Sequence, residues 1–226
     1  FWEKATLGTG RLPPKSASII ETDLLERRWE NIFKIINQIG RFQKQLIDLE
    51  SGSIECLWVD DYHLIIEIGR LKAKSIMKGW LLHLELCSKG LVPKGTIIIA
   101  RKSSDEYQET LRWNSITTTQ AKIYLENLKA LVVQGYSECW PIPPESGWAL
   151  AISQRDSPEK ANEIFERKWN GQFNVEGEKH KLTMKLCFGD NCKASVFLQN
   201  HSFQKALLLL YEPIIKNLHT PSKSAE

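Results

Sequence analysis

Apolar residues recur at intervals of three and four in several parts of the chain, a spacing that places them on one face of a helix. In the first such run, Leu25, Trp29, Ile32 and Ile36 fall on one face, and Gly40 is a suitable stop. This run predicts a helix from Thr22. Further helices are predicted from about Ser75 to just before Gly90, from Thr118 or Thr119 to Gly135, over 157–171, and from about Ser202 to Pro213.

Shorter apolar runs predict strands. "IECLWV" (54–59) and "LIIEI" (64–68), joined by "DDYH", favour a β-hairpin, and "GTIIIA" (95–100) a buried strand followed by a return strand at "TLRW". The proline-rich "CWPIPPESG" (139–147) is expected to be extended, since prolines remove backbone donors. We expect a short strand at "WALAIS" that follows it.

This order of elements predicts a mixed α/β fold, with a mixed sheet flanked by helices in a single domain over 1–226. Residues 1–20 are expected to form a segment that wraps over the surface, and 216–226 a frayed tail. The sequence begins at Phe1 with neither an initiator Met nor a signal peptide, so we expect a fragment of a longer subunit. No apolar run reaches the roughly 18 residues that span a membrane.

Composition is that of an ordinary globular protein, with 42% hydrophobic and 25% charged residues. The five cysteines are scattered and form no Cys-x-x-Cys pair, which favours buried, reduced thiols in a cytoplasmic protein over zinc or disulfides. His83 and Cys87 have a spacing that can ligate metal, but core packing is the favoured interpretation. Ser146 lacks the flanking pattern of a nucleophile elbow. No glycine-rich stretch has P-loop spacing, so no cofactor or metal is predicted.

Positive charge is concentrated in one segment. The whole chain carries +3, whereas residues 70–102 contain eight basic residues and one acid, Glu85, for a net +7. A local excess of cations suits a phosphate backbone, although a solvated surface is the alternative. The residues predicted to contact nucleic acid are Arg70, Lys72, Lys74, Arg101 and Lys102. Nearby aromatic residues that could stack on bases are Trp58, Tyr62 and Trp113, for which core packing is favoured.

An acid just before this basic segment, Glu67, raises the question of nuclease chemistry. Metal-dependent nucleases of the PD-(D/E)xK class need an acid on one strand and Asp/Glu-x-Lys on the next, because residues i and i+2 of a strand share a side. Glu67 ends an apolar run, but the residue two positions on is Gly69. The layout is therefore that of a degenerate nuclease-like core without catalytic residues.

An active nuclease is the alternative. In it Glu67 and either Asp60 or Asp61 would bind the metal, and a bulge or an early helix start would bring Lys72 into the place of the missing lysine.

Several stretches resemble the RecC family, the gamma subunit of exodeoxyribonuclease V. "GRLKAKSIMKGWLLHLELC" is similar to the family's R-x3-L-x7-W-L-x-H-L segment, and "PIPPESGWAL" resembles its P-E-S-G stretch. "IFERKWNGQFNVEGE" and "ATLGTGRLPPKSA" are similar to two more, in the family's order. The hairpin region from Ser51 to Tyr62 is shorter here than in the family, so the element that separates strands is not assigned to particular residues.

The resemblance implies a C-terminal domain with a nuclease-like fold that has lost its catalytic residues. It further implies work with RecB-like and RecD-like subunits in a helicase–nuclease that repairs double-strand breaks, where the domain helps to split duplex DNA and guide the strands. A domain that only packs against partner subunits, without touching DNA, remains a further alternative.

Overall fold

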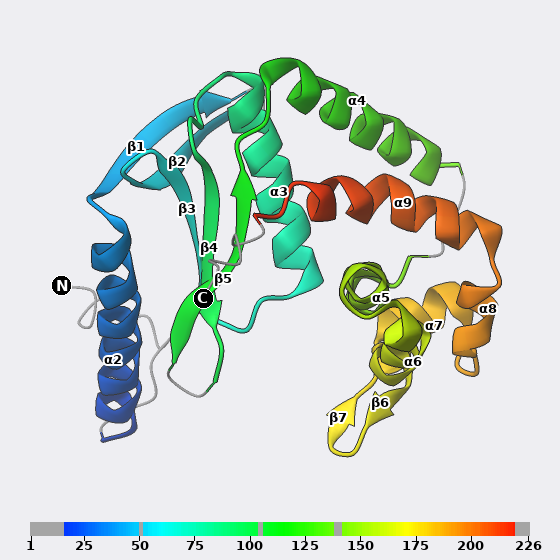
Figure 1. The fold of residues 1–226 in the computed structure, drawn as a ribbon. Helices are drawn as coiled ribbons and strands as arrows, with labels where there is room; N and C mark the ends of the chain where they lie inside the picture. Colours follow the sequence, from blue (N-terminus) through cyan, green and yellow to red (C-terminus); the bar gives the residue numbers. More distant parts are fainter. Residues whose placement is uncertain (1–15, 50–51, 104–105, 138–141, 220–226) are drawn as a thin grey trace, which may run out of the picture. The chain divides into compact units, whose positions relative to one another are not determined.

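The computed structural model describes residues 16–49, 52–103, 106–137 and 142–219 (Figure 1). These residues form two compact units that alternate along the chain. The first unit contains the described residues up to Leu71 together with Thr96–Arg112. The second contains Lys72–Gly95 and the described residues from Trp113 onward. The single domain over 1–226 stays a prediction.

The first unit is built on a five-stranded mixed sheet. Its strands lie side by side in chain order: β1 (Phe42–Leu49), β2 (Gly52–Val59), β3 (Tyr62–Glu67), β4 (Gly95–Arg101) and β5 (Tyr107–Asn114). β2 pairs antiparallel with β1 on one side and with β3 on the other, so the predicted hairpin of β2 and β3 is confirmed. β1 was not predicted. The turn from β2 to β3 places Asp60 in the left-handed region, at φ 49°.

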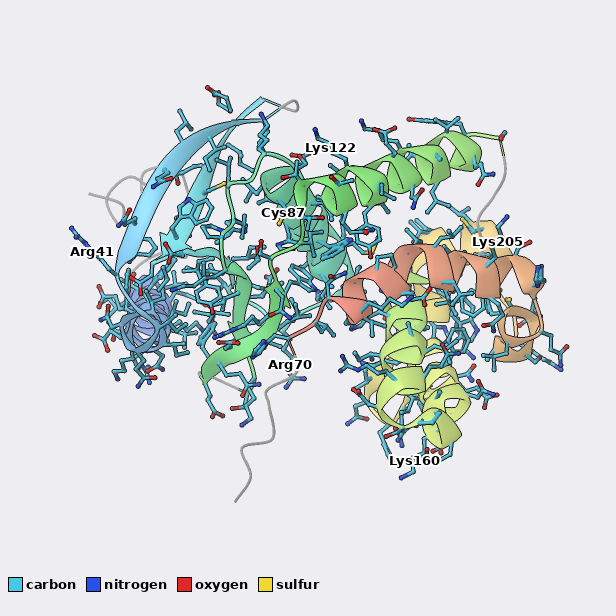
Figure 2. All side chains as sticks on the ribbon, turned by 45° about the horizontal axis from the view of Figure 1, so that its top comes forward. Arg41, Arg70, Cys87, Lys122, Lys160 and Lys205 are labelled. Carbon is cyan, nitrogen blue, oxygen red and sulfur yellow. The ribbon has the colours of Figure 1, made fainter. Side chains whose placement is uncertain are left out.

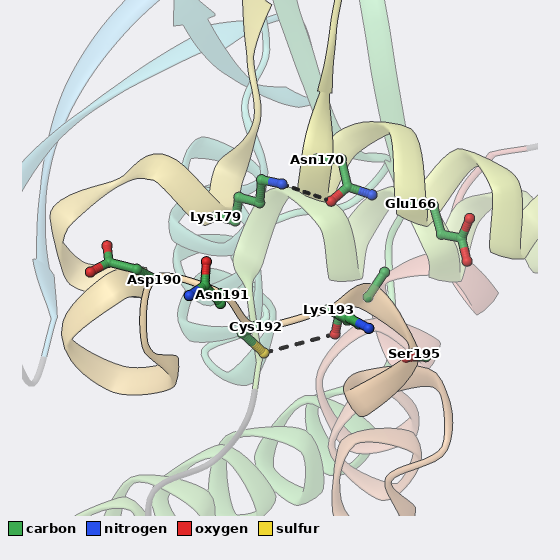
Figure 3. Close-up of a pocket in the computed structure, with 9 residues that line it drawn as sticks. Glu166, Asn170, Lys179, Asp190, Asn191, Cys192, Lys193 and Ser195 are labelled. Atoms are coloured by element: carbon green, nitrogen blue, oxygen red, sulfur yellow. Dashed lines mark hydrogen bonds between the residues drawn. The ribbon is translucent and has the colours of Figure 1, made fainter.

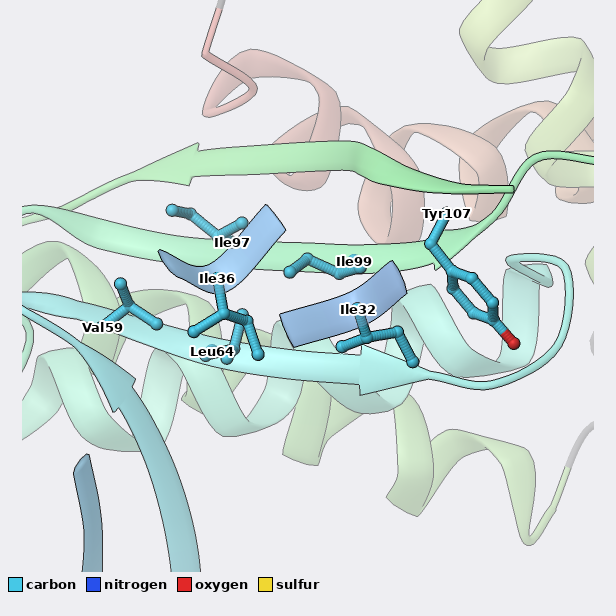
Figure 4. Close-up of a cluster of buried hydrophobic side chains, with 7 residues drawn as sticks. All are labelled: Ile32, Ile36, Val59, Leu64, Ile97, Ile99 and Tyr107. Carbon is cyan, nitrogen blue, oxygen red and sulfur yellow. The ribbon is translucent and has the colours of Figure 1, made fainter. Parts of the chain in front are cut away.

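One long helix, α2 (Ser16–Ile39), packs on one face of this sheet. Ile32 and Ile36 are fully buried there, as their four-residue spacing on one helix face requires. They meet five buried residues of the sheet (Figure 4): Val59, Leu64, Ile97, Ile99 and Tyr107. α2 begins at Ser16, six residues before the predicted start, so 16–20 are helical rather than part of a loop. Residues 1–15 of the predicted wrapping segment lie outside the described residues.

The second unit is helical. Its longer helices are α3 (Ala73–Ser88), α4 (Thr118–Gly135), α5 (Pro144–Asp156), α6 (Ala161–Asn170) and α9 (His201–Lys216). Shorter elements lie between α5 and α9: the 3-10 turns Pro158–Lys160 and Glu178–His180, the hairpin of β6 (Gly171–Gln172) and β7 (Val175–Glu176), α7 (Leu182–Phe188) and α8 (Ala194–Leu198). Aromatic residues fill much of the core, including Trp80 with Trp113 and Trp169 with Phe197.

Two predictions about this unit were wrong. "WALAIS" is part of α5 rather than a strand, because Pro144 stands at the first helical position, where a missing N–H costs nothing. Residues 216–219 of the predicted frayed tail are also structured, since Leu218 forms a β-bridge with Trp113; residues 220–226 lie outside the described residues. The helix predicted to end at Pro213 continues to Lys216.

Within the described residues, no helix is both long and apolar enough to cross a membrane.

Candidate nucleic-acid interface

The acid of the nuclease-like pattern stands at the end of β3. Glu67 is the last residue of that strand, and its Oε1 accepts a long hydrogen bond of 3.4 Å from the N–H of Gly69. Gly69 occupies the position two residues on, where the nuclease class has lysine. An added Cβ at Gly69 would meet Oε1 of Glu67 at 3.6 Å, an ordinary contact. The backbone therefore has room for a side chain that the sequence does not supply.

The other candidate acids lie at the opposite end of the same strand. Asp60 and Asp61 form the turn before β3, and Oδ1 of Asp60 accepts a hydrogen bond of 2.9 Å from the N–H of Arg41. A strand rises about 3.3 Å per residue, so Asp61 and Glu67 stand roughly 20 Å apart. One metal ion cannot bind both. The described residues also contain no group of three His, Cys, Asp or Glu side chains that could hold a metal.

Lys72, the displaced lysine of the alternative, belongs to the second unit. It is the N-cap residue of α3 and has an extended backbone, with φ −114° and ψ 154°. The first N–H of that helix, on Ala73, donates to Oε2 of Glu145 at 3.2 Å. A carboxylate of the protein thus takes a helix-end donor that could otherwise have bound phosphate.

Three of the five predicted nucleic-acid contacts come together in the first unit. The N–H of Arg101, at the end of β4, donates to the carbonyl of Gly69 at 3.1 Å, which places Arg70 beside the end of β4. Arg70 and Lys102 are exposed and Arg101 is half-buried (Figure 2 labels Arg70). Lys102 also pairs with Glu106 at 3.7 Å, a surface pair that constrains it little.

The remaining two predicted contacts, Lys72 and Lys74, lie in the second unit. Both are exposed in the first turn of α3 or just before it. The structure therefore joins Arg70, Arg101 and Lys102 into one basic group, which we call the strand-end group. It leaves Lys72 and Lys74 in a different unit.

The aromatic candidates for stacking on bases are engaged within the protein. Trp58 and Trp113 are buried, at 6% and 0% exposure, which confirms core packing for both. Tyr62 is half-buried, and the guanidinium of Arg112 lies over its ring at 4.9 Å from the centroid. Arg112 in turn makes two hydrogen bonds to Glu109, of 2.6 and 2.7 Å. These hydrogen bonds raise the pKa of Arg112 above its ordinary value.

The pair at metal-ligand spacing on α3 is also part of the core. His83 is fully buried and stacks on Trp80, with ring centroids 5.1 Å apart, while Sγ of Cys87 lies 3.6 Å from its Nε2. Burial raises the pKa of the Cys87 thiol, so the protonated form is favoured. The expectation of core packing for this pair is confirmed.

Reasoning from the sequence missed a buried acid, Glu178, that organises the second unit. It is 3% exposed, and its carboxylate accepts hydrogen bonds from the N–H of Glu145 at 3.1 Å and from the N–H and Oγ of Ser146 at 2.7 and 2.8 Å. It therefore caps the N-terminus of α5 from 33 residues downstream. Burial, and then the charges of Glu178 and Glu145, raise the pKa of the nearby Tyr211. Glu145 and Ser146 lie in "PIPPESGWAL", and Glu178 is the last residue of "IFERKWNGQFNVEGE". The resemblance of these two stretches to the RecC family was the only signal in the sequence that could have pointed to the cap.

A polar pocket lies between α6 and the segment that leads into α8 (Figure 3). Its lining combines acids, amides and lysines, and Nζ of Lys179 donates to Oδ1 of Asn170 at 3.1 Å. Cys192 is its one sulfur, and burial raises the pKa of that thiol. Sγ of Cys192 donates a weak hydrogen bond of 3.8 Å to the carbonyl of Lys193.

The sheet and the helices together define a mixed α/β protein. The chain belongs to the RecC C-terminal domain family, whose model matches residues 2–155. Membership places it in the context of the RecBCD complex and of DNA repair and recombination. A search of curated proteins gave no match. The family match ends within α5, so the resemblance at "IFERKWNGQFNVEGE" stays a prediction.

Proposed function

We propose that this chain is a non-catalytic DNA-handling and scaffold domain of a RecBCD-type helicase–nuclease, built on a degenerate PD-(D/E)xK core. The observation that carries the proposal is Gly69, two residues beyond Glu67 at the end of β3. The two-residue spacing supplies no lysine there, and Asp60 and Asp61 stand at the far end of the strand, too far to share one metal ion with Glu67. In this role the domain helps to split the duplex and guide the separated strands.

The DNA contact that we propose is made by the strand-end group, with Lys72 and Lys74 as further contacts from the second unit. Exposed cations at the ends of adjacent strands can follow a phosphate backbone without reading its sequence. Each phosphate that they neutralise releases counterions, so binding should weaken steeply with salt. RecB-like and RecD-like subunits are the proposed protein partners, and no metal or cofactor takes part.

The first experiment asks whether the purified chain cuts DNA. End-labelled single- and double-stranded DNA is incubated with the chain and Mg²⁺ or Mn²⁺, alongside Glu67→Ala. We expect no cleavage by either protein. Cleavage that Glu67→Ala abolishes would establish the active nuclease and overturn the proposal.

A second experiment tests the DNA contact. Binding of forked DNA is measured over a salt series for the chain with the strand-end group changed to alanine. We expect the slope of log K against log salt to fall by about 2 to 3, since each contact contributes roughly 0.9. A matched control removes three exposed cations elsewhere in the first unit: Arg27, Lys34 and Arg41. If the slope falls equally in both variants, the loss of net charge explains the effect and a specific contact is refuted.

A further inference from the structure

β1 is an edge strand that carries few of the usual protections. It pairs with β2 on one side and forms the end of the strand order of the described sheet. All eight of its residues keep one uninterrupted register with β2, from Phe42 opposite Val59 to Leu49 opposite Gly52, so no bulge twists the edge away. It contains no proline and a single lysine, Lys44. Proteins usually shorten, bulge or charge such an edge, because it is a template for another strand.

The backbone groups that face the free side follow from one hydrogen bond. The carbonyl of Arg41 accepts from the N–H of Asp60 at 3.0 Å, and these two residues continue the register of β1 with β2. In an antiparallel pair, residues that point their backbone groups at the partner alternate with residues that point them away. Odd-numbered positions of β1 therefore face β2. The even-numbered positions Phe42, Lys44, Leu46 and Asp48 point their backbone groups the other way, and of these the free edge offers the N–H and C=O groups of Phe42, Lys44 and Leu46.

The side chains at these same four positions are apolar and charged in alternation. They share a face with Val59, which belongs to the core beneath α2. Phe42 is 37% exposed and Leu46 is 73% exposed, both large for apolar residues. Lys44 pairs with Glu55 of β2, with about half of each side chain in solvent, and Asp48 accepts a hydrogen bond from Ser53.

The apolar surface continues from the strand onto α2. The ring of Phe42 meets Phe33 at 6.2 Å between centroids, and Phe33 meets Trp29 at 5.9 Å. Trp29 and Phe33 are themselves 40% and 43% exposed and line a groove on that helix. A row of exposed aromatic rings thus borders the side of the strand to which Phe42 and Leu46 point. Such a surface suits side chains arriving on an added strand.

We propose that the free edge of β1 binds an extended segment of a partner chain by strand addition. The row of backbone N–H and C=O groups pairs with an added β-strand, and the side chains of β1 determine which residues that strand carries. The residues opposite Phe42 and Leu46 are apolar, and the residue opposite Lys44 is acidic. This charge complementarity fixes the register of the added strand, which backbone hydrogen bonds alone would not fix. The inference rests on the proposed scaffold function and names the surface through which that function is exercised.

Hydrogen exchange tests the ladder at single amides. The probe is the set of remaining subunits of the RecBCD-type complex, and exchange is compared between the isolated chain and the assembled complex. In the isolated chain we expect the amides of Lys44 and Leu46 to exchange at least about tenfold faster than those of Gln45 and Ile47, which face β2. On assembly, the Lys44 and Leu46 amides should slow at least about tenfold.

Four outcomes would count against the inference. If the Lys44 and Leu46 amides are already protected in the isolated monomeric chain, another part of the chain occupies the edge. If protection appears only in a self-associated form, the occupant is a second copy. Unchanged exchange in a complex that does assemble refutes strand addition too, but leaves the scaffold function intact, because assembly then uses another surface. Failure to assemble at all would count against both.

A pair of variants separates the edge from general surface effects. Leu46→Lys should weaken assembly at least about tenfold by placing a charge against the incoming apolar residue. Leu182→Lys is its control, since Leu182 on α7 is 72% exposed, nearly the same as Leu46. Leu46→Pro removes only an N–H that faces away from β2, so the sheet should persist while binding is lost. Binding by both Leu46 variants at the level of the control would refute the proposal.

Discussion

Glu178→Ala removes the acceptor that caps α5 from within the second unit. The substitution leaves three donors without a partner: the N–H of Glu145 and the N–H and Oγ of Ser146, now bonded at 2.7 to 3.1 Å. A buried hydrogen bond to a charged group contributes about 1.5 to 3 kcal/mol, and the contributions of neighbouring bonds do not add fully. We expect a loss of about 3 to 5 kcal/mol in unfolding free energy, the usual result of breaking a buried charged network.

For a chain of this length, such a loss lowers the melting temperature by roughly 6 to 20 °C. Calorimetry measures the shift, and urea unfolding followed by tryptophan fluorescence gives the free energy. Glu166→Ala, an exposed acid on α6, is the control and should change stability by no more than about 0.5 kcal/mol. A loss below about 1 kcal/mol for Glu178→Ala would refute the capping role. A double-mutant cycle with Ser146→Ala should give a coupling of about 0.5 to 3 kcal/mol.

Three further outcomes are expected. Burial lowers the pKa of His63 to about 4, so between pH 6.5 and 4 the unfolded chain binds a proton that the folded chain does not. The unfolding free energy, measured by urea unfolding, should therefore fall by up to about 3 kcal/mol as pH falls through that range, and His63→Phe should lack this pH dependence. Gly95→Ala should lower the unfolding free energy by at least about 3 kcal/mol in urea unfolding, because the added Cβ would stand 2.0 Å from the carbonyl oxygen of Trp113. Gly52→Ala is the comparison: it has a positive φ but open space around the added Cβ, and should lower the unfolding free energy by only about 1 kcal/mol. Gly69→Lys restores the Asp/Glu-x-Lys spacing but supplies no second acid, so it should yield no Mg²⁺-dependent cleavage; activity in that variant would contradict the account of the strand-end site.

Local patterns were sufficient wherever the deciding contacts are local. The β2–β3 hairpin, the buried strand β4 and helices α3, α4 and α6 follow from periodicity and terminal signals, and their ends lie within a few residues of those predicted. β1 escaped detection because most of its residues are exposed on both faces, so its sequence carries almost no alternation. α5 was mistaken for a strand because its N-terminus is completed by Glu178, too far along the chain for a local pattern to register.

The same distinction holds for the candidate site. The absence of a lysine after Glu67 could be read from two-residue spacing alone, since a strand imposes that geometry. That Asp60 and Glu67 lie at opposite ends of β3 was equally implicit in the predicted hairpin. By contrast, the burial of Trp58 and Trp113 and the engagement of Tyr62 by Arg112 depend on neighbours from other strands and, for Trp113, from α3. The proximity of Arg70 to Arg101 depends on the pairing of strand ends, which the sequence does not encode locally.

The alternation of the two units along the chain determines where the polypeptide can be cut. The chain leaves the sheet after Leu71 and returns to it at Thr96, so α3 is an insertion within the sequence of the first unit. A fragment that stops at Leu71 would expose the apolar edge of β3, where β4 should pair, and would be expected to aggregate. The shortest N-terminal fragment able to complete the sheet therefore extends to the end of β5 and carries α3 with it. During synthesis the ribosome must likewise release α3 before the sheet can close, so this part of the first unit folds late.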